Sequence, residues 1–417
     1  MEYLYSMKEI GSTYRGIHID SDPYFPQQSK STKNSSRLKG KSSQRAKAVI
    51  GYAISLTGCE ETSYIDGAAV LKQSIHQNSI HNPKSTSKYS YKLYAIVHPS
   101  AVLCAQALHD LLGFEVLVRD TPFDMNDIRG EFYKSRVNQS GCCGEREFIK
   151  LYAYTLVEHP IVVHLDMDVL ILNPMDELFD AMLDPRSDKH RRSVPSMHNQ
   201  TLPSNIQAYF TRDYNMAYPG KEHVGAQGGF LIFKPNATVL NEYVDIVLEG
   251  KFCPGSGWGC EGWGNFWGAP QIQGIVPYYY DKFYPNTAVE LDRCFYNNMA
   301  DPPRQLTNKQ DHTVGKCMDG RDECQDCRTT DIHKVKTVHF TICQKPWRCV
   351  DYGHICTHMH RAWFTYRNQL EQDHTTTVLV TPNNGTFMPD TFLGYCWKQD
   401  NQGYIPMKFP STNNTLL

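Results

Sequence analysis

The chain has 417 residues, a length that fits two or three ordinary domains or one large α/β domain with attached segments. Its 42 Lys and Arg nearly balance its 44 Asp and Glu, so a net charge of −2 offers no overall field for nucleic acid or an anionic membrane. No apolar run approaches the roughly 18 to 20 residues that cross a bilayer, so we expect neither a nucleic-acid partner nor a membrane span.

The first segment, residues 1–47, has the composition of a disordered tail or stalk. Between Ser29 and Lys47 there are seven Lys or Arg and six Ser, with no acidic residue. A segment with so few apolar side chains cannot bury a core of its own. The ordered part of the chain is therefore predicted to begin near residue 48.

From there the chain alternates between short apolar runs rich in β-branched residues and segments with helical spacing. Strands are predicted at 48–56, 93–97, 115–118 and 161–165, and helices at 64–75, 101–112 and 145–157. Strands that alternate with helices along the chain imply βαβ units, which bind ligands at the carboxyl ends of the strands. The predicted fold class is thus α/β, with a mostly parallel central sheet flanked by helices.

Two carboxylates interrupt the apolar stretch from Ile161 to Pro174. Asp166 and Asp168 stand two positions apart, and on an extended chain such residues point to the same side. Burying a carboxylate without a partner is costly, so a shared divalent cation is the simplest account of the pair. The alternative, in which one aspartate caps a turn and the other faces water, is equally compatible with the triplet alone. Neither a dinucleotide fingerprint nor a P-loop is present, so any nucleotide is held differently.

The surroundings of this pair resemble a known family. Residues 148–179 look like the central segment of family 8 glycosyltransferases, the glycogenin-like nucleotide-sugar transferases of GT-A fold. Residues 336–347 resemble the closing segment of that family, with His339 six positions before Lys345. Weaker resemblances lie at Leu56 and Thr57 with Tyr64 beyond them, and at 228–235. The resemblance covers roughly residues 48–347.

The resemblance implies a metal site made by Asp166, Asp168 and His339. Two carboxylates and an imidazole form a mixed oxygen and nitrogen set, which favours Mn²⁺, with Mg²⁺ as the alternative. The ion would bind the diphosphate of a UDP-sugar, the expected donor. For His339 the competing interpretation is an ordinary core histidine at a strand end.

The resemblance also implies roles for other residues. Lys345 would stabilise the charge on the leaving nucleotide. Lys150 matches a lysine that reaches toward the first aspartate and the donor, with a solvated helix lysine as the less favoured alternative. The residues implied to be catalytic are Asp166, Asp168, Lys345 and Gln273, and those implied to bind the donor are Leu56, Thr57, Tyr64, Lys150, Gln227 and Lys345.

Three departures from the family pattern affect the expected chemistry. Gln227 stands where an asparagine is usual, which keeps an amide on a longer side chain. Ile272 precedes Gln273 where an aspartate is usual, so a carboxylate is missing. Ile342 replaces a glycine between the histidine and the lysine, so the fit to the diphosphate is expected to differ.

The segment 257–268 carries three of the six tryptophans, separated by glycines. Flat indoles on a pliable loop suit a carbohydrate acceptor or a lid. A loop closed by a Cys253–Cys260 bridge, with its tryptophans packed inward, is an equal alternative. Glu261, a carboxylate within this loop, is a candidate for orienting an acceptor hydroxyl.

The chain has 14 cysteines, six of them between Cys317 and Cys356. We expect a disulfide-stapled loop at 317–327 near the donor site, with a zinc knuckle as the second interpretation. Glycosylation acceptor sequences occur at Asn34, Asn138, Asn199, Asn236, Asn384 and Asn413. These features favour the Golgi or another secretory lumen, whereas the first ten residues lack the pattern of a secretory signal and favour the cytoplasm.

The sequence therefore predicts a GT-A glycosyltransferase domain over 48–370 and a C-terminal extension over 371–417. The expected reaction is metal-dependent, retaining transfer of a hexose from a UDP-sugar to a carbohydrate or other hydroxyl-bearing acceptor. A non-catalytic sugar or nucleotide binder of the same fold is the alternative, motivated by Ile272. A glycoside hydrolase is a weaker one, because it needs two carboxylates about 5 to 9.5 Å apart across a cleft.

Overall fold

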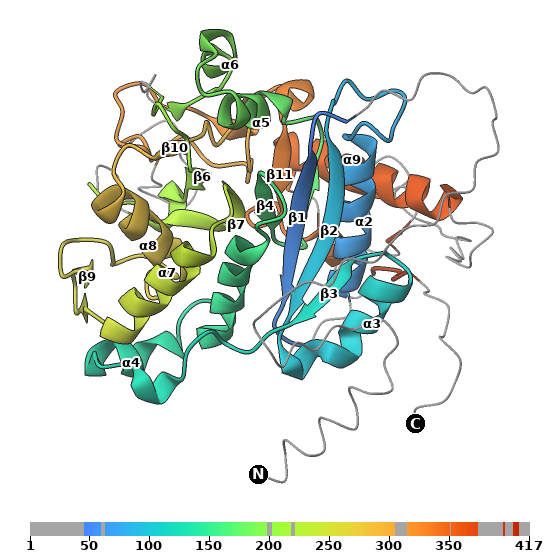
Figure 1. Ribbon diagram of the computed structural model, residues 1–417. Helices are drawn as coiled ribbons and strands as arrows, with labels where there is room; N and C mark the ends of the chain where they lie inside the picture. Colours follow the sequence, from blue (N-terminus) through green and yellow to red (C-terminus); the bar gives the residue numbers. More distant parts are fainter. Residues whose placement is uncertain are drawn as a thin grey trace.

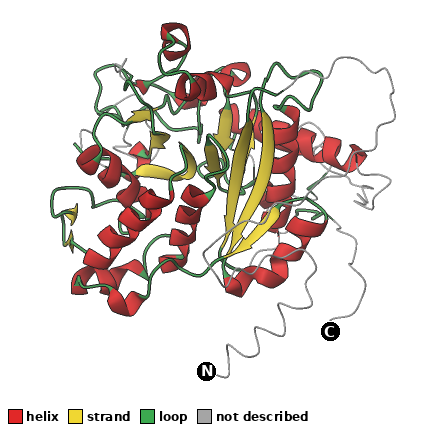
Figure 2. Cartoon of the chain, in the orientation of Figure 1, coloured by secondary structure: helices red, strands yellow, loops and turns green. Residues whose placement is uncertain are grey.

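The computed structural model describes residues 46–59, 63–197, 202–217, 222–304, 315–350, 352–373, 395–396 and 403–407. Nearly all of the predicted tail, 1–47, and most of the predicted extension, 371–417, lie outside the described residues. Within the described ranges a central sheet is covered by helices on both faces (Figure 1, Figure 2). The predicted α/β class, with a mostly parallel sheet flanked by helices, is confirmed.

The main sheet has seven strands in the order β10-β6-β7-β4-β1-β2-β3. They are β1 (Val49–Leu56), β2 (Ser90–Val97), β3 (Glu115–Val118), β4 (Val162–Leu165), β6 (Ala208–Arg212), β7 (Ala226–Phe233) and β10 (Ala288–Glu290). In this sheet β7 alone runs antiparallel to its neighbours, β4 and β6. Strand β1, which lies between β4 and β2, is buried along nearly all its length. Because helices cover both faces of the sheet, the sequence of β1 is a nearly continuous apolar run.

Helices form a layer on each face of the sheet (Figure 1). On one face α2 (Ser63–Gln77) packs against α9 (His354–Asp373) and α3 (Val102–Asp110). The other face is covered by the 3₁₀ helix η3 (Gly144–Thr155), α7 (Ala237–Glu249) and α8 (Ile272–Tyr278). Each layer encloses its own hydrophobic cluster against the sheet.

Shorter elements connect these layers. They are α4 (Glu131–Val137), α5 (Asp176–Leu183), α6 (Asp188–Arg192), the two-stranded ribbons β5 (Val169–Ile171) with β11 (Thr337–His339) and β8 (Phe252–Cys253) with β9 (Gly257–Trp258), the 3₁₀ turns η1 (Pro99–Ala101), η2 (Met125–Asp127), η5 (Tyr214–Met216), η7 (Cys327–Thr329), η8 (Ile332–Lys334) and η9 (Pro346–Arg348), and the π-helix η6 (Tyr279–Phe283). No helix in the described ranges has both the length and the apolar character to span a bilayer.

The strands and helices predicted between residues 48 and 165 are all present, with ends that differ by a few residues. The helix predicted at 145–157 differs in type, because it is the 3₁₀ helix η3. In a 3₁₀ helix, side chains three positions apart lie almost directly above one another. Glu147 and Lys150 are such a pair, and both therefore face the same side of η3.

Candidate active site

A cleft of about 640 Å³ opens at the edge of the sheet where β1, β4 and β6 end. This is the edge at which a mostly parallel sheet places ligands. The ten residues to which the family resemblance assigns a catalytic, donor-binding or metal role all line this cleft: Leu56, Thr57, Tyr64, Lys150, Asp166, Asp168, Gln227, Gln273, His339 and Lys345. The structure thus brings together segments that are far apart in the chain.

Asp166 and Asp168 lie in the tight turn between β4 and β5. The backbone N–H of Val169 donates to the carbonyl oxygen of Asp166 at 3.1 Å, which closes the turn. The prediction that the two carboxylates sit on extended chain is therefore wrong. Gly67 of α2 allows this turn to pack closely, because a Cβ there would stand 2.5 Å from the carbonyl oxygen of Met167.

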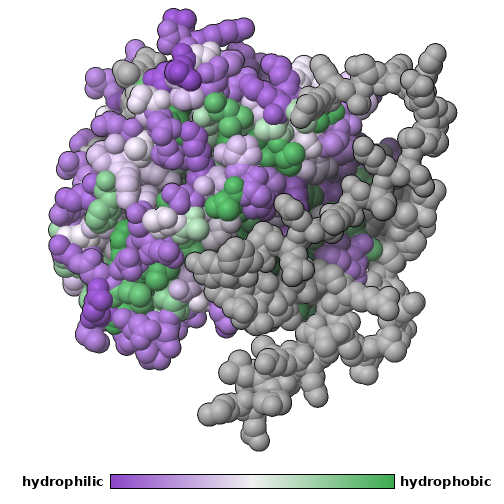
Figure 3. All heavy atoms as spheres, in the orientation of Figure 1, coloured by the Kyte–Doolittle hydropathy of each residue, from purple (hydrophilic) through white to green (hydrophobic). Residues whose placement is uncertain are grey.

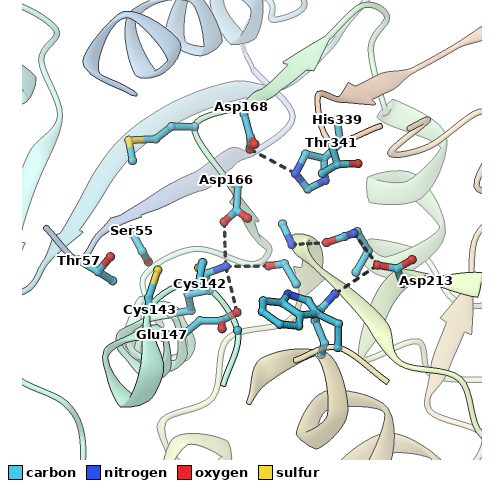
Figure 4. Close-up of a pocket in the computed structure, with 18 of the residues that line it drawn as sticks. Ser55, Thr57, Cys142, Cys143, Glu147, Asp166, Asp168, Asp213, His339 and Thr341 are labelled. Atoms are coloured by element: carbon cyan, nitrogen blue, oxygen red, sulfur yellow. Dashed lines mark hydrogen bonds and ion pairs between the residues drawn. The ribbon is translucent and has the colours of Figure 1, made fainter. Parts of the chain in front are cut away.

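His339 reaches the carboxylates through the ribbon of β5 and β11. The antiparallel register places His339 opposite Val169, directly after the turn. Its Nε2 lies 3.2 Å from Oδ1 of Asp168, and one ligand atom from each of Asp166, Asp168 and His339 lies within 4.8 Å of the others (Figure 4). Gly229 of β7 makes room, because a Cβ there would stand 2.5 Å from the imidazole ring and 2.7 Å from Asp166.

These three side chains fit a divalent cation. Apart from its 3.2 Å contact with Nε2 of His339, the buried Oδ1 of Asp168 has no hydrogen-bond partner among the described residues, and the buried Nδ1 of His339 has none there either. Buried polar atoms are seldom left without a partner unless an ion or water is to satisfy them. Two carboxylates and one imidazole together form a mixed oxygen and nitrogen donor set for a divalent cation.

Two lysines form ion pairs with the two aspartates of the turn. The Lys345 ammonium contacts Oδ2 of Asp168. Burial alone would raise the pKa of Asp168, but Lys345 and His339 together hold it well below its usual range. Lys150 lies 2.9 Å from Oδ1 of Asp166 and 3.5 Å from Oε1 of Glu147 (Figure 4). Burial would lower the pKa of Lys150, yet these two carboxylates outweigh it and raise the pKa, so the lysine stays charged.

Asp213 is a cleft residue that the sequence prediction missed. It follows the last residue of β6, is 3% exposed, and accepts hydrogen bonds from Gln227 at 3.0 Å and Gln273 at 3.3 Å (Figure 4). Burial first, and then the nearby Asp301, raises its pKa to about 7. A carboxylate thus stands beside Gln273, although Ile272 itself carries none. An aspartate directly after an apolar strand was the signal available in the sequence.

The cysteine-rich segment is held by disulfides rather than by zinc. Twelve of the cysteines form the pairs Cys59–Cys104, Cys253–Cys260, Cys294–Cys327, Cys317–Cys324, Cys343–Cys356 and Cys349–Cys396. Because Cys324 and Cys327 bond to different partners, the zinc knuckle is not formed. The thiols of Cys142 and Cys143 are free and line the cleft.

The glycine- and tryptophan-rich loop combines the two predicted alternatives, a disulfide-closed loop with buried tryptophans and a loop that presents an indole at the cleft. The bridge between Cys253 and Cys260 closes it, and Trp258 and Trp263 pack inward, 0% and 5% exposed. Trp267, in contrast, is 57% exposed and lines the cleft. Glu261 does not line the cleft and instead pairs with Lys282 at 2.6 Å, so the structure does not support its role at an acceptor hydroxyl.

No protein-family model matches the chain, and no curated protein matches it. Among solved structures, the apo form of the bifunctional glycosyltransferase WbbM is 12% identical, with a TM-score of 0.39 over 78% of this chain and 52% of that chain. Apo mouse xyloside xylosyltransferase 1 is 14% identical, with a TM-score of 0.40 over 70% and 97% of the two chains. The galactosyltransferase LgtC, in complex with donor and acceptor sugar analogues, is 13% identical, with a TM-score of 0.39 over 79% and 100%. The chain spans about half the length of WbbM, and similarities this low carry no conclusion about function.

Proposed function

We propose that this chain is a metal-dependent glycosyltransferase of the GT-A type, related to family 8, that transfers a hexose from a UDP-sugar to a hydroxyl acceptor with retention of configuration. The observation that carries the proposal is the convergence of Asp166, Asp168 and His339, with Lys345 beside them, in one cleft at the carboxyl edge of the sheet. The remaining roles follow from where the other side chains lie.

The donor would lie along the cleft from the end of β1 to the Asp166–Asp168 turn. Leu56, Thr57 and Tyr64 form the end at which the uridine would bind. Asp166, Asp168 and His339 would hold Mn²⁺, with Mg²⁺ as the alternative, and the ion would offset the negative charge on the diphosphate.

The lysines complete the charge pattern at the donor. The Lys345 ammonium, already beside Asp168, would donate to the nucleotide as the bond to the anomeric carbon breaks. Lys150 keeps its position through Asp166, Glu147 and the carbonyl oxygen of Gly228, which it meets at 3.3 Å. It would thereby orient the Asp166 carboxylate rather than react.

The hexose and the acceptor hydroxyl would meet near Gln227 and Gln273. Asp213 supports this assignment because it holds both amides and supplies the carboxylate that Ile272 lacks. The argument for a non-catalytic binder loses its main support for the same reason. For retention, the acceptor hydroxyl would attack from the side of the departing diphosphate.

Six disulfides are typical of an oxidising compartment. We therefore place the activity in the lumen of the secretory pathway, with the Golgi as the first compartment to examine.

The test is release of free UDP from UDP-glucose, UDP-galactose and UDP-N-acetylglucosamine with Mn²⁺, with and without EDTA. We expect release from at least one donor, loss of release with EDTA, and a decrease on the order of 100-fold or more for Asp168→Asn. Asp188→Asn, an exposed aspartate on α6, should behave as the unchanged chain. Metal-independent cleavage of simple glycosides would point to a hydrolase, and nucleotide binding without any UDP release would point to a binder.

A further inference from the structure

A second cavity, of about 350 Å³, adjoins the cleft. It is lined by Phe132, Arg136, Gln139, Ser140, Phe252, Cys253, Gly255, Gly257, Asn265, Phe266, Trp267, Gly268, Ala269 and Pro270. Trp267 lines both cavities, so its indole forms part of the wall between them. Apolar side chains reach the surface over α4 in this part of the molecule (Figure 3). The volume lies at the lower end of the ~300 to 1,000 Å³ typical of small-ligand sites.

The chemistry of this second cavity suits a sugar. Phe132 and Phe252 stack with ring centroids 6.4 Å apart, and the guanidinium of Arg136 lies 5.5 Å from the Phe132 ring. Gln139 and Asn265 also line the cavity, and none of the lining residues is a carboxylate. The exposed indole of Trp267 matches the C–H face of a pyranose, and the Gln139 amide and the Arg136 guanidinium can donate to its hydroxyls.

The loop that carries Trp267 is braced, although the indole itself is exposed. The indole N–H of the buried Trp258 donates to the carbonyl oxygen of Ala269 at 2.7 Å, and the Cys253–Cys260 bridge closes the preceding hairpin. A side chain at Gly268 would collide with the amide of Gln273, so this loop touches a residue of the cleft. An exposed indole on a fixed loop loses little conformational entropy when a ligand stacks on it.

We propose that the acceptor is an extended neutral oligosaccharide whose terminal sugar stacks on Trp267 at the edge of the cleft and whose following sugars occupy the second cavity. The inference rests on the proposed function, because it assumes that the cleft holds the donor. It adds the acceptor class and the residues that bind it.

The experiment measures glycan binding without donor and in EDTA, by saturation-transfer NMR titration of cellotetraose, xylotetraose, maltotetraose and chitotetraose and of the matching disaccharides. We expect at least one tetrasaccharide to bind about tenfold or more tightly than its disaccharide. Trp267→Ala should weaken that tetrasaccharide at least tenfold, and Trp267→Phe should restore binding to within about threefold. Tyr352→Ala is the matched control, because Tyr352 is 53% exposed and lines neither cavity.

The inference is overturned if none of the four tetrasaccharides binds, or if Trp267→Ala binds as tightly as the unchanged chain. Metal-dependent UDP release together with absent glycan binding would overturn this inference alone. Glycan binding that depends on Trp267, without UDP release from any donor, would support the glycan site and overturn the proposed transferase.

Discussion

Nε2 of His339 lies 3.2 Å from Oδ1 of Asp168, although the two residues belong to separate segments of the chain. The contact exists because β11 pairs antiparallel with β5, which begins immediately after Asp168. The ribbon of β5 and β11 therefore acts as the frame of the candidate metal site. Substitutions that disturb the pairing of β5 with β11 should weaken metal binding even where they leave the stability of the main sheet unchanged.

Gly229 gives a direct test of this geometry. A Cβ at Gly229 would stand 2.5 Å from Cε1 of His339 and 2.7 Å from Oδ2 of Asp166. Gly229→Ala should separate the ligands and weaken Mn²⁺ binding at least tenfold, measured by calorimetric titration. At the adjacent Gly228 the nearest atoms would be 3.4 Å away, an ordinary contact. Gly228→Ala is thus the matched control, and equal losses of Mn²⁺ affinity in both variants would contradict the assigned site.

Replacing Lys345 tests whether this lysine stabilises the leaving nucleotide or positions the carboxylate of Asp168. Lys345→Met removes the cation proposed to stabilise the leaving nucleotide, so turnover should fall on the order of 100-fold. The same change removes a positive charge beside Asp168, so Mn²⁺ affinity should stay the same or increase. Kinetics of UDP release and a Mn²⁺ titration on the same preparation measure both effects, with the exposed Lys84→Met as control. A loss of Mn²⁺ affinity would show that Lys345 acts mainly by positioning the carboxylate.

The buried carboxyl group of Asp213 should make stability depend on pH. Its pKa is raised from 3.8 to about 7 in the folded chain, so the folded state keeps a proton that the unfolded state loses between these values. Stability should consequently fall as pH rises through this window, by about 3 kcal/mol between pH 5 and pH 8. Asp213→Asn lacks this titration. Urea unfolding of both chains in EDTA should show the variant gaining relative stability toward pH 8, and a constant difference would refute the assignment.

The bridge between Cys349 and Cys396 should contribute more stability than the bridge between Cys317 and Cys324. The first joins residues 47 apart and the second residues 7 apart, which corresponds to about 1.6 kcal/mol more loop-closure entropy. Cys396 of the longer bridge also pairs with Tyr404 in the segment 403–407, where Tyr404 and Met407 donate hydrogen bonds to Asp66. Urea unfolding of the two double Cys→Ala variants compares them, and a larger loss for the 317–324 pair would contradict this ranking.

The local sequence was sufficient for the strands and helices predicted between residues 48 and 165 and for the pair Asp166 and Asp168. Apolar runs such as 161–165 mark buried strands because both faces of the sheet are covered, and Asp166 and Asp168 are conspicuous within such a run. His339 and Lys345, in contrast, were predicted only because residues 336–347 resemble the closing segment of a known family. All of these side chains line one cleft.

Other features depend on how distant segments meet. Asp213 joins Gln227 and Gln273 because β6 lies beside β7 in the sheet, an order that strand patterns alone do not reveal. Trp267 is exposed between two cavities while Trp258 and Trp263 of the same loop are buried, a difference set by packing against α4 and α8. Local patterning thus determined the strands and helices between residues 48 and 165 and the pair Asp166 and Asp168. Only tertiary packing decided which carboxylate stands beside Gln273 and which tryptophan faces solvent, because those outcomes depend on contacts between segments far apart in the chain.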